Sequence, residues 1–224
     1  EFGEIKIRKN KLSRSVKLSV GVDGSLRASI PYYSPEFAVR RLVNSNRDEI
    51  RKMLATHNAK NSYQDGDLIG KTHTLFLRKF SGEEIKISNE GNQILVQIPQ
   101  ELAFENPLVQ SEIRKTVSKI LRKQAKAYLP RRISFLAEKY GFSFEKLRFS
   151  HTGTRWGSCS SSGTISLNIA LMNLPHHLID YVIIHELCHT RQMNHSSKFW
   201  QEVEKYCPNY KTCVKEMKQF SPSI

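Results

Sequence analysis

The sequence predicts a mixed α+β fold, with an N-terminal portion of strands and helices followed by a helical segment and a compact core. Three observations support this prediction. Stretches of alternating apolar and polar residues occur before residue 100, a helical spacing of apolar residues extends from Asn106 to about Tyr140, and a short run of potential metal ligands lies on a further helical pattern after Pro175. Because the strand patterns are grouped and do not alternate regularly with helices, the α+β class is favoured. We expect an N-terminal portion over residues 1–105 and a second portion over residues 106–224.

The composition is that of a globular protein. The chain has 224 residues, of which 39% are hydrophobic and 25% are charged, and this excludes a disordered or fibrous protein. Its longest apolar runs are about four residues, far short of the roughly 20 that a membrane-spanning helix requires. The first six residues lack the features of a secretory signal, and the four cysteines lack the spacing of a disulfide framework or a Cys-x-x-Cys zinc site. We therefore expect a soluble cytoplasmic protein with reduced thiols and no membrane partner.

The charge is strongly basic and unevenly distributed. The chain has 35 Lys and Arg residues against 21 Asp and Glu residues, a formal net charge of +14. Residues 151–224 carry seven basic and five acidic side chains, a net of +2, which leaves +12 for residues 1–150. Such an excess favours polyanionic partners, either nucleic acid bound through the basic N-terminal portion or a phosphorylated substrate.

The N-terminal portion begins with strands. Residues 5–31 alternate apolar and polar side chains around Asp23-Gly24, which predicts short antiparallel strands in a basic hairpin. Ser34-Pro35-Glu36 then has the pattern of a helix start, and we expect that helix to run to about Thr56. The polar stretch from His57 to Gly70 is expected to be a loop.

Further strands and a long helical region follow. Strands are predicted over Thr74 to Lys79 and Ile94 to Ile98, with a third candidate between them and a turn at Gly91. The helical spacing after Asn106 is interrupted by Pro130, which predicts two helices. The outward positions of this region are mostly basic: Arg114, Lys115, Lys119, Arg122, Lys123, Lys126, Arg131 and Arg132. A solvated helix face is the favoured interpretation of this charge, ahead of a nucleic-acid site.

The pattern His185-Glu186-Leu187-Cys188-His189 is the sharpest functional signal. The apolar residues Leu178, Ile179, Val182 and Ile183 precede it at helical spacing, so the motif is expected on a buried helix. Residues four apart lie on one face of a helix, so both imidazoles can point at one metal ion, with Glu186 beside them to reach a water molecule on that ion.

His195 is the candidate third ligand. It follows His189 by six residues, the spacing of the long metalloprotease motif, but Gln192 stands where that motif has glycine. We therefore expect the chain to turn by another route, with Asn194 in a left-handed conformation and a new helix starting at His195-Ser196-Ser197. Phe199, Trp200 and Val203 are expected to bury that helix.

Four blocks of residues resemble the successive signatures of the YgjP-like metallopeptidases, a family related to the SprT-like and WLM zinc proteases of the zincin group. The blocks are Arg155-Trp156-Gly157-Ser158-Cys159-Ser160, then Gly163 to Asn168, then Tyr181 to His189, and finally Asn194 to Trp200. The strongest resemblance covers about residues 150 to 210, and the family domain is expected to span most of the chain.

The resemblance implies a zincin-like minimal core that holds one Zn²⁺ through His185, His189 and His195, with Glu186 as general base. The implied activity is hydrolysis, with peptide bonds favoured as substrate. Two alternatives remain open. One is a nucleoside triphosphate pyrophosphatase that uses the same metal site, because some relatives are assigned that activity. The other is a nucleic-acid-binding module in which zinc only stabilises the fold.

The stretch from Arg155 to Asn168 is predicted to form a hairpin beside the metal helix, with its turn between Gly157 and Gly163. An edge strand in this position can receive an extended peptide by strand addition. Arg155 and Trp156 are the substrate-binding candidates, since Arg155 could stabilise an oxyanion or a phosphate. An equally supported interpretation places Trp156 and Leu167 in the core behind the site.

Several other reactive residues are given structural roles. Cys159 has no partner in sequence that would make it a nucleophile, and Cys188 is expected to act as a small buried hydrophobe. His176 and His177 are expected at the surface where the metal helix begins. His151 precedes the hairpin and could approach the site.

Overall fold

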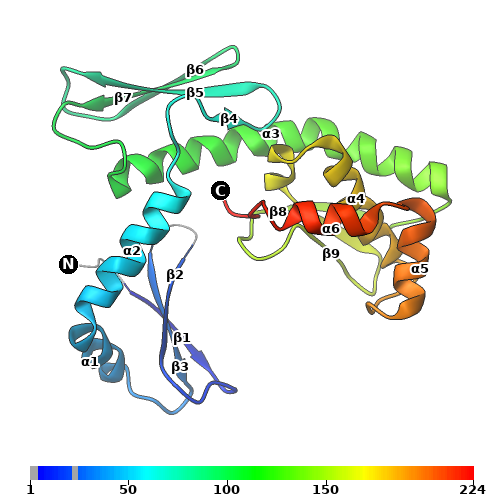
Figure 1. Cartoon of the computed structure of the whole chain (residues 1–224), viewed down its shortest axis with the longest axis horizontal. Coiled ribbons are helices and arrows are strands. Elements are labelled where there is room, and N and C mark those ends of the chain that lie inside the picture. The colour runs from blue at the N-terminus through cyan, green and yellow to red at the C-terminus, as the bar shows by residue number, and fades with distance from the viewer. Residues whose placement is uncertain (1–4, 22–24) are drawn as a thin grey trace. The chain divides into compact units, whose positions relative to one another are not determined.

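The computed structural model describes residues 5–21 and 25–224 (Figure 1). It confirms the α+β class, because helices combine with three small sheets. The chain forms two compact units: residues 1–65, 77–86 and 97–113 make the first, and residues 66–76, 87–96 and 114–224 make the second. Within the described residues, no helix combines the length and the apolar character that a membrane span requires.

The first unit contains a three-stranded sheet packed against two helices. Its strands are β1 (Lys6–Asn10), β2 (Lys17–Val20) and β3 (Leu26–Pro31), in the order β1-β3-β2. Leu26, Ala28 and Ile30 alternate along β3 and are almost completely buried, and they form a core with Val39, Val43 and Ile50 of the helices. The predicted antiparallel pair is β2 with β3, but β1 pairs in parallel with β3, which the hairpin prediction did not include. The predicted turn at Asp23-Gly24 lies outside the described residues.

The single helix predicted after Pro35 is instead two helices. α1 (Phe37–Ser45) ends at Asn46, and α2 (Arg47–Asn61) begins directly after it. The Asn46 side chain donates a hydrogen bond to the Leu42 carbonyl at 2.9 Å, so it competes with the backbone for a helical acceptor. α2 also continues to Asn61, so the loop expected from His57 begins later than predicted.

A four-stranded sheet follows, with the order β4-β5-β7-β6. Its strands are β4 (Leu68–Ile69), β5 (His73–Phe80), β6 (Lys86–Glu90) and β7 (Gln93–Pro99). β5, β6 and β7 confirm the predicted strands, whereas β4 lies in the stretch that was expected to be a loop. Gly91 has a φ of +58° in the turn between β6 and β7, a conformation that glycine adopts easily.

Helix α3 (Pro107–Tyr140) is continuous, so the prediction that Pro130 divides it was wrong. Proline in a helix interior costs about 3 kcal/mol through a lost hydrogen bond and a steric clash. Leu129 and Ile133 on either side of Pro130 are fully buried, and each such side chain contributes about 1.5–3 kcal/mol on burial. Burial of the apolar face therefore outweighs the local penalty.

The C-terminal part of the second unit carries the histidine motif. Its sheet has the order β8-β10-β9, with β8 (Lys146–Ser150), β9 (Gly157–Cys159) and β10 (Thr164–Asn168), and its helices are η1 (Ile169–Asn173), α4 (His176–Cys188), α5 (Ser197–Tyr206) and α6 (Tyr210–Met217). β9 and β10 form the predicted antiparallel hairpin. The turn is shorter than predicted, because Gly157 to Cys159 pair with β10 and only the residues up to Gly163 (φ +75°) reverse the chain. β9 is the edge strand and packs against α4.

Candidate metal centre

Helix α4 carries the first two histidines and the glutamate on a rigid support. Leu178, Ile179 and Ile183 are fully buried, so the helix is held by the core along its length. His185 lies in its last turn, and His189 directly follows its last residue in a helical conformation (φ −65°, ψ −20°). The spacing of four residues therefore brings both imidazoles to one face, as the sequence predicts.

The chain turns after His189 without a left-handed residue. Among the described residues only glycines have positive φ, so the conformation expected for Asn194 was wrong. Successive short-range hydrogen bonds make the turn instead: the Thr190 and Arg191 amides donate to carbonyls three residues earlier, and the Gln192 amide donates to the Cys188 carbonyl. Turns of this kind need no positive φ. α5 then begins at Ser197.

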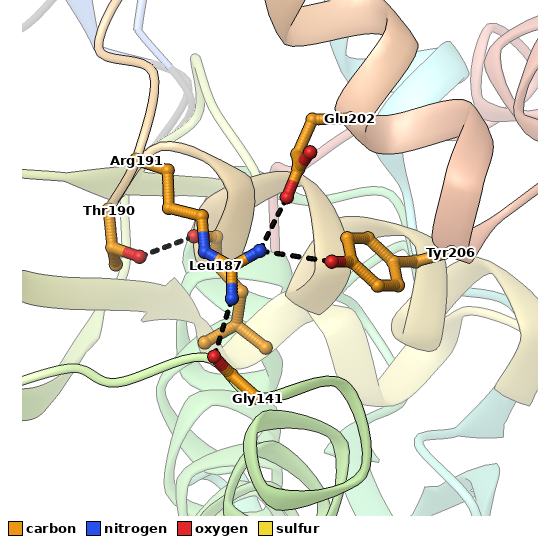
Figure 2. Close-up of polar contacts among 6 residues, drawn as sticks. All are labelled: Gly141, Leu187, Thr190, Arg191, Glu202 and Tyr206. Atoms are coloured by element: carbon orange, nitrogen blue, oxygen red, sulfur yellow. Dashed lines mark hydrogen bonds and ion pairs between the residues drawn. The ribbon is translucent and has the colours of Figure 1, made fainter.

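Arg191 holds this turn in place, and sequence analysis missed it. Its guanidinium donates to Glu202 (2.5 Å) and to the Tyr206 hydroxyl (2.9 Å), both on α5, and to the Gly141 carbonyl at the end of α3 (Figure 2). The Thr190 hydroxyl also donates to the Leu187 carbonyl at 2.7 Å. These bonds connect α5 to the end of α4 and so help to fix the position of His195 beside the other two histidines.

The structure brings the three histidines together. One potential ligand atom from each of His185, His189 and His195 lies within 4.8 Å of the other two. The Nε2 atoms of His185 and His195 are 3.1 Å apart, and the ring centroids are separated by 4.7–5.1 Å. Such convergence of three imidazoles is the arrangement of a metal site with open coordination positions.

Aromatic rings from α5 restrict how the imidazoles can rotate. Phe199 is fully buried, stacks on His189 at 4.4 Å between ring centroids and contacts His185 and His195 at 4.9 and 4.8 Å. Trp200 stacks on His195 at 5.8 Å and is itself stacked on Tyr210 of α6. Phe199 and Val203 are fully buried, which confirms that they bury α5 as predicted, and Trp200 is half-buried.

Hydrogen bonding and burial prepare the histidines as metal ligands. His189 Nδ1 lies 3.0 Å from the Gln192 carbonyl, to which it can only donate, so Nε2 keeps its lone pair for a metal. Burial, with the nearby His189 and His195, lowers the pKa of His185 to about 3, and burial also lowers the pKa of His189. Both rings are therefore neutral at neutral pH, the form that binds a metal. The donor set fits one cation such as zinc.

Glu186 is the carboxylate beside these rings. It is 5% exposed, and its Oε2 atom, like His185 Nδ1, has no hydrogen-bond partner among the described residues. Burial raises the pKa of Glu186 to about 8, and the Arg155 guanidinium opposes part of that rise. Burying a carboxyl oxygen without a partner costs folding free energy, and such groups in native structures often mark functional sites. Glu186 is therefore a strong candidate for chemistry at this site.

Gly157 allows Glu186 to occupy its position. A Cβ atom at residue 157 would lie 2.6 Å from Glu186 Oε1 and 2.8 Å from its Cδ and Cγ atoms, closer than real side chains approach. Sequence analysis treated Gly157 only as a turn residue. Its place as the first residue of a hairpin strand was the available signal, because a glycine in a strand often marks a close approach.

Two cavities adjoin the histidines. The first, about 310 Å³, is lined by Arg155, Ser158, Cys159 and Met193 together with Gly157, Glu186 and the three histidines. The second, about 270 Å³, is lined mainly by apolar side chains, including Trp156. The structure thus places Arg155 and Trp156 beside the site, in different cavities, whereas Leu167 is fully buried.

The other candidates lie apart or lack the needed chemistry. Cys159 faces the first cavity, but burial and the nearby Glu186 raise the pKa of its thiol, which disfavours a thiolate. His151 contacts Ser118, His176 contacts Tyr128, and His177 pairs with Glu216, and none of these histidines lines either cavity. Cys188 is fully buried, as predicted.

Comparison with known proteins agrees with this description. The sequence model of the YgjP-like metallopeptidase domain matches residues 14–220. Two solved structures are similar: the metallopeptidase zymogen of Pyrococcus abyssi abylysin (28% identity, TM-score 0.37, 41% of this chain and 93% of that chain) and that of Methanocaldococcus jannaschii jannalysin (21% identity, TM-score 0.34, 39% and 93%). No curated protein matches the chain. Because the family model covers nearly the whole chain, this protein belongs to the YgjP-like metallopeptidase family and is a metal-dependent hydrolase.

Proposed function

We propose that the protein is a zinc-dependent peptidase in which His185, His189 and His195 hold one zinc ion and Glu186 is the general base. The observation that carries the proposal is the buried Glu186 carboxylate, whose Oε2 atom has no hydrogen-bond partner in the described part of the chain and which lies beside three converging imidazoles. Zinc in such a site acts as a Lewis acid that activates water and polarises a carbonyl. Glu186 would accept the proton of the attacking water and later transfer it to the leaving amine.

The surroundings of the site suit an extended peptide. β9 is an edge strand next to α4, so a substrate segment can add to it through backbone hydrogen bonds. Arg155 lines the same cavity as the histidines and can donate to the oxygen on which negative charge develops. Arg155 is the only Lys or Arg residue among the described residues that line the two cavities. A triphosphate would need several such donors, so a peptide is the favoured substrate.

The test is hydrolysis of a peptide panel and a nucleoside triphosphate panel by the zinc-loaded protein. We expect peptide cleavage that falls by about 10²- to 10⁴-fold in Glu186→Gln, the range for loss of a general base, while bound zinc is retained. Glu204→Gln is the matched control, because this glutamate is exposed on α5. Cleavage of nucleotides alone would refute the peptidase assignment, and full activity of Glu186→Gln would refute the assigned base.

A second function, binding of nucleic acid, is favoured by one feature of the first unit. Paired strand residues share a face, and the register sets Lys6 opposite Arg27, with Arg8 and Lys17 on either side of Ser29. The buried residues of β3 alternate with these, so the four cations share the outer face. None of the three strands contains an acidic residue. We propose that this face, which we call the basic sheet face, contacts a phosphate backbone.

Salt dependence tests the second function. An oligonucleotide should bind with an affinity that falls steeply as salt rises, and Arg8→Ala with Lys17→Ala should weaken binding and reduce the salt slope by about two. Lys119→Ala with Lys126→Ala, two exposed positions of α3, is the matched control. If only the α3 pair alters binding, the basic sheet face is not the contact. If the zinc-loaded protein hydrolyses neither panel while nucleic-acid binding persists in Glu186→Gln, the structural-zinc alternative is correct.

A further inference from the structure

The cavity lined by Trp156 lies directly beside the candidate base. It shares Gly157, His185 and Glu186 with the cavity that holds the three histidines. The remaining lining comes from Tyr181 and Val182 of α4 and from Val214 and Met217 of α6. A substrate group bound at the histidines therefore lies next to this second cavity, because His185 and Glu186 line both.

The lining is suited to an apolar side chain. Val182 is 4% exposed and Tyr181 is 7% exposed, so this wall belongs to the packed core and is already shaped. No Lys or Arg residue is among the described residues that line the cavity, and the one carboxylate at its edge is Glu186. An acidic side chain would meet Glu186 in a lining that offers no Lys or Arg, and any charged side chain would lose hydration.

The cavity has room for one large side chain. Its volume is about 270 Å³, just below the range of roughly 300–1,000 Å³ found for sites that enclose whole drug-sized ligands. Large aliphatic and aromatic side chains gain most from leaving water, whereas alanine or glycine would leave most of the cavity unfilled.

We infer that this cavity, which we call the α6 pocket, binds a large apolar side chain of the substrate, from a residue next to the scissile bond. The inference rests on the proposed peptidase function and adds the substrate class: peptides with leucine, methionine or phenylalanine at that position. Val214 and Met217 determine how deep the pocket is. The preference is set by α6, which contributes none of the three histidines and does not carry Glu186.

The experiment compares matched peptides that differ only in the residues flanking the cleaved bond. For the zinc-loaded wild-type protein, kcat/KM should be at least about tenfold higher for leucine or phenylalanine than for alanine or aspartate at one of those positions. In Val214→Phe, which fills the pocket, the ratio of kcat/KM for phenylalanine over alanine peptides should fall by about tenfold or more. Because each variant is compared with itself, partial loss of folded protein does not alter the ratio.

A second variant and a control keep the test decisive. Met217→Ala enlarges the pocket and should shift the preference from leucine towards phenylalanine. Lys215→Phe, an equally bulky change at an exposed position of α6, should leave the ratios as in the wild-type protein. Binding of the same peptides to zinc-loaded Glu186→Gln, measured by fluorescence anisotropy, should show the same order of affinity without turnover.

The outcomes separate the two proposals. Peptide cleavage with ratios that stay within about twofold of wild type in both Val214→Phe and Met217→Ala would overturn the α6 pocket and leave the peptidase proposal standing. A preference for acidic or basic residues at both flanking positions would also overturn it. If the zinc-loaded wild-type protein cleaves no peptide of the series, both proposals fail.

Discussion

The two units use polar residues in opposite ways. In the second unit, Glu186 and His189 of the metal centre are buried and His185 is half-buried, whereas His195 is exposed. Phe199 contacts all three imidazole rings. In the first unit, every residue of β1 is exposed, and the cations of the basic sheet face point into solvent from a sheet with a small core behind it. Burial gives polar groups fixed positions and altered pKa values, whereas exposure leaves them suited to attraction at a distance.

Removal of the metal should produce the largest difference between the two units. Chelation, or His189→Ala, should abolish peptide cleavage and make α4 and α5 open more easily, because a bound ion at 1,000 times its Kd stabilises a fold by about 4 kcal/mol. Hydrogen exchange measured by mass spectrometry should show faster exchange in α4 and α5 and no change in β1 to β3. Metal analysis checks that one zinc ion is lost. Equal acceleration in both units would contradict the assignment of the ion to the second unit.

Gly157→Ala should separate catalysis from metal binding. The added Cβ must displace the Glu186 carboxylate, so kcat should fall by about 10²-fold, the lower end of what a general base contributes. Zinc content and thermal stability should change little, because the three atoms nearest to this Cβ all belong to Glu186. Ser162→Ala, an exposed position in the turn after β9, is the control and should retain activity. Activity of Gly157→Ala equal to that of Ser162→Ala would show that Glu186 is not held by this contact.

Phe199→Leu should weaken the packing that orients the imidazole rings and so lower the affinity for zinc. Loss of the ring that stacks on His189 should lower zinc affinity by about 10-fold, the smaller end of the range for residues that orient ligands. Ile30→Val, a change in the first-unit core, should cost about 0.5–1.5 kcal/mol of stability and leave zinc affinity unchanged. Competition with a chelator of known affinity measures the difference. The prediction fails if both variants bind zinc as the wild type does.

The smallest effect is expected at the basic sheet face. Ser29→Glu places a carboxylate between Arg8 and Lys17 on neighbouring strands, which should stabilise the first unit by about 0.2–1 kcal/mol at low salt. The same change should weaken oligonucleotide binding, because it neutralises part of the face. Ser29→Gln provides a neutral side chain of the same size, and urea unfolding of the two variants gives the difference. A Gln variant as stable as the Glu variant would show that the cations do not interact across the strands.

Local patterns predicted much of the fold. The strands β5, β6 and β7, the hairpin of β9 and β10, and the buried helix with His185 and His189 follow from periodicity, which depends only on neighbouring residues. The errors arose where packing opposed a local preference. Pro130 did not break α3 because the residues around it are buried, and no left-handed Asn194 was needed because Arg191 and short-range hydrogen bonds secure the turn. The parallel pairing of β1 with β3 is a long-range contact that leaves no mark in local sequence.

The sequence by itself determined the residue types of the metal centre and the pairing of His185 with His189, because a spacing of four residues on a helix is local geometry. It also determined the excess of positive charge before residue 150. Only the tertiary structure decided that His195 reaches the other two rings, that Gly157 makes room for Glu186, and that α6 closes an apolar pocket beside them. Those contacts join separate elements, and their geometry depends on how buried side chains from distant parts of the chain pack against one another. No local sequence pattern specifies that packing.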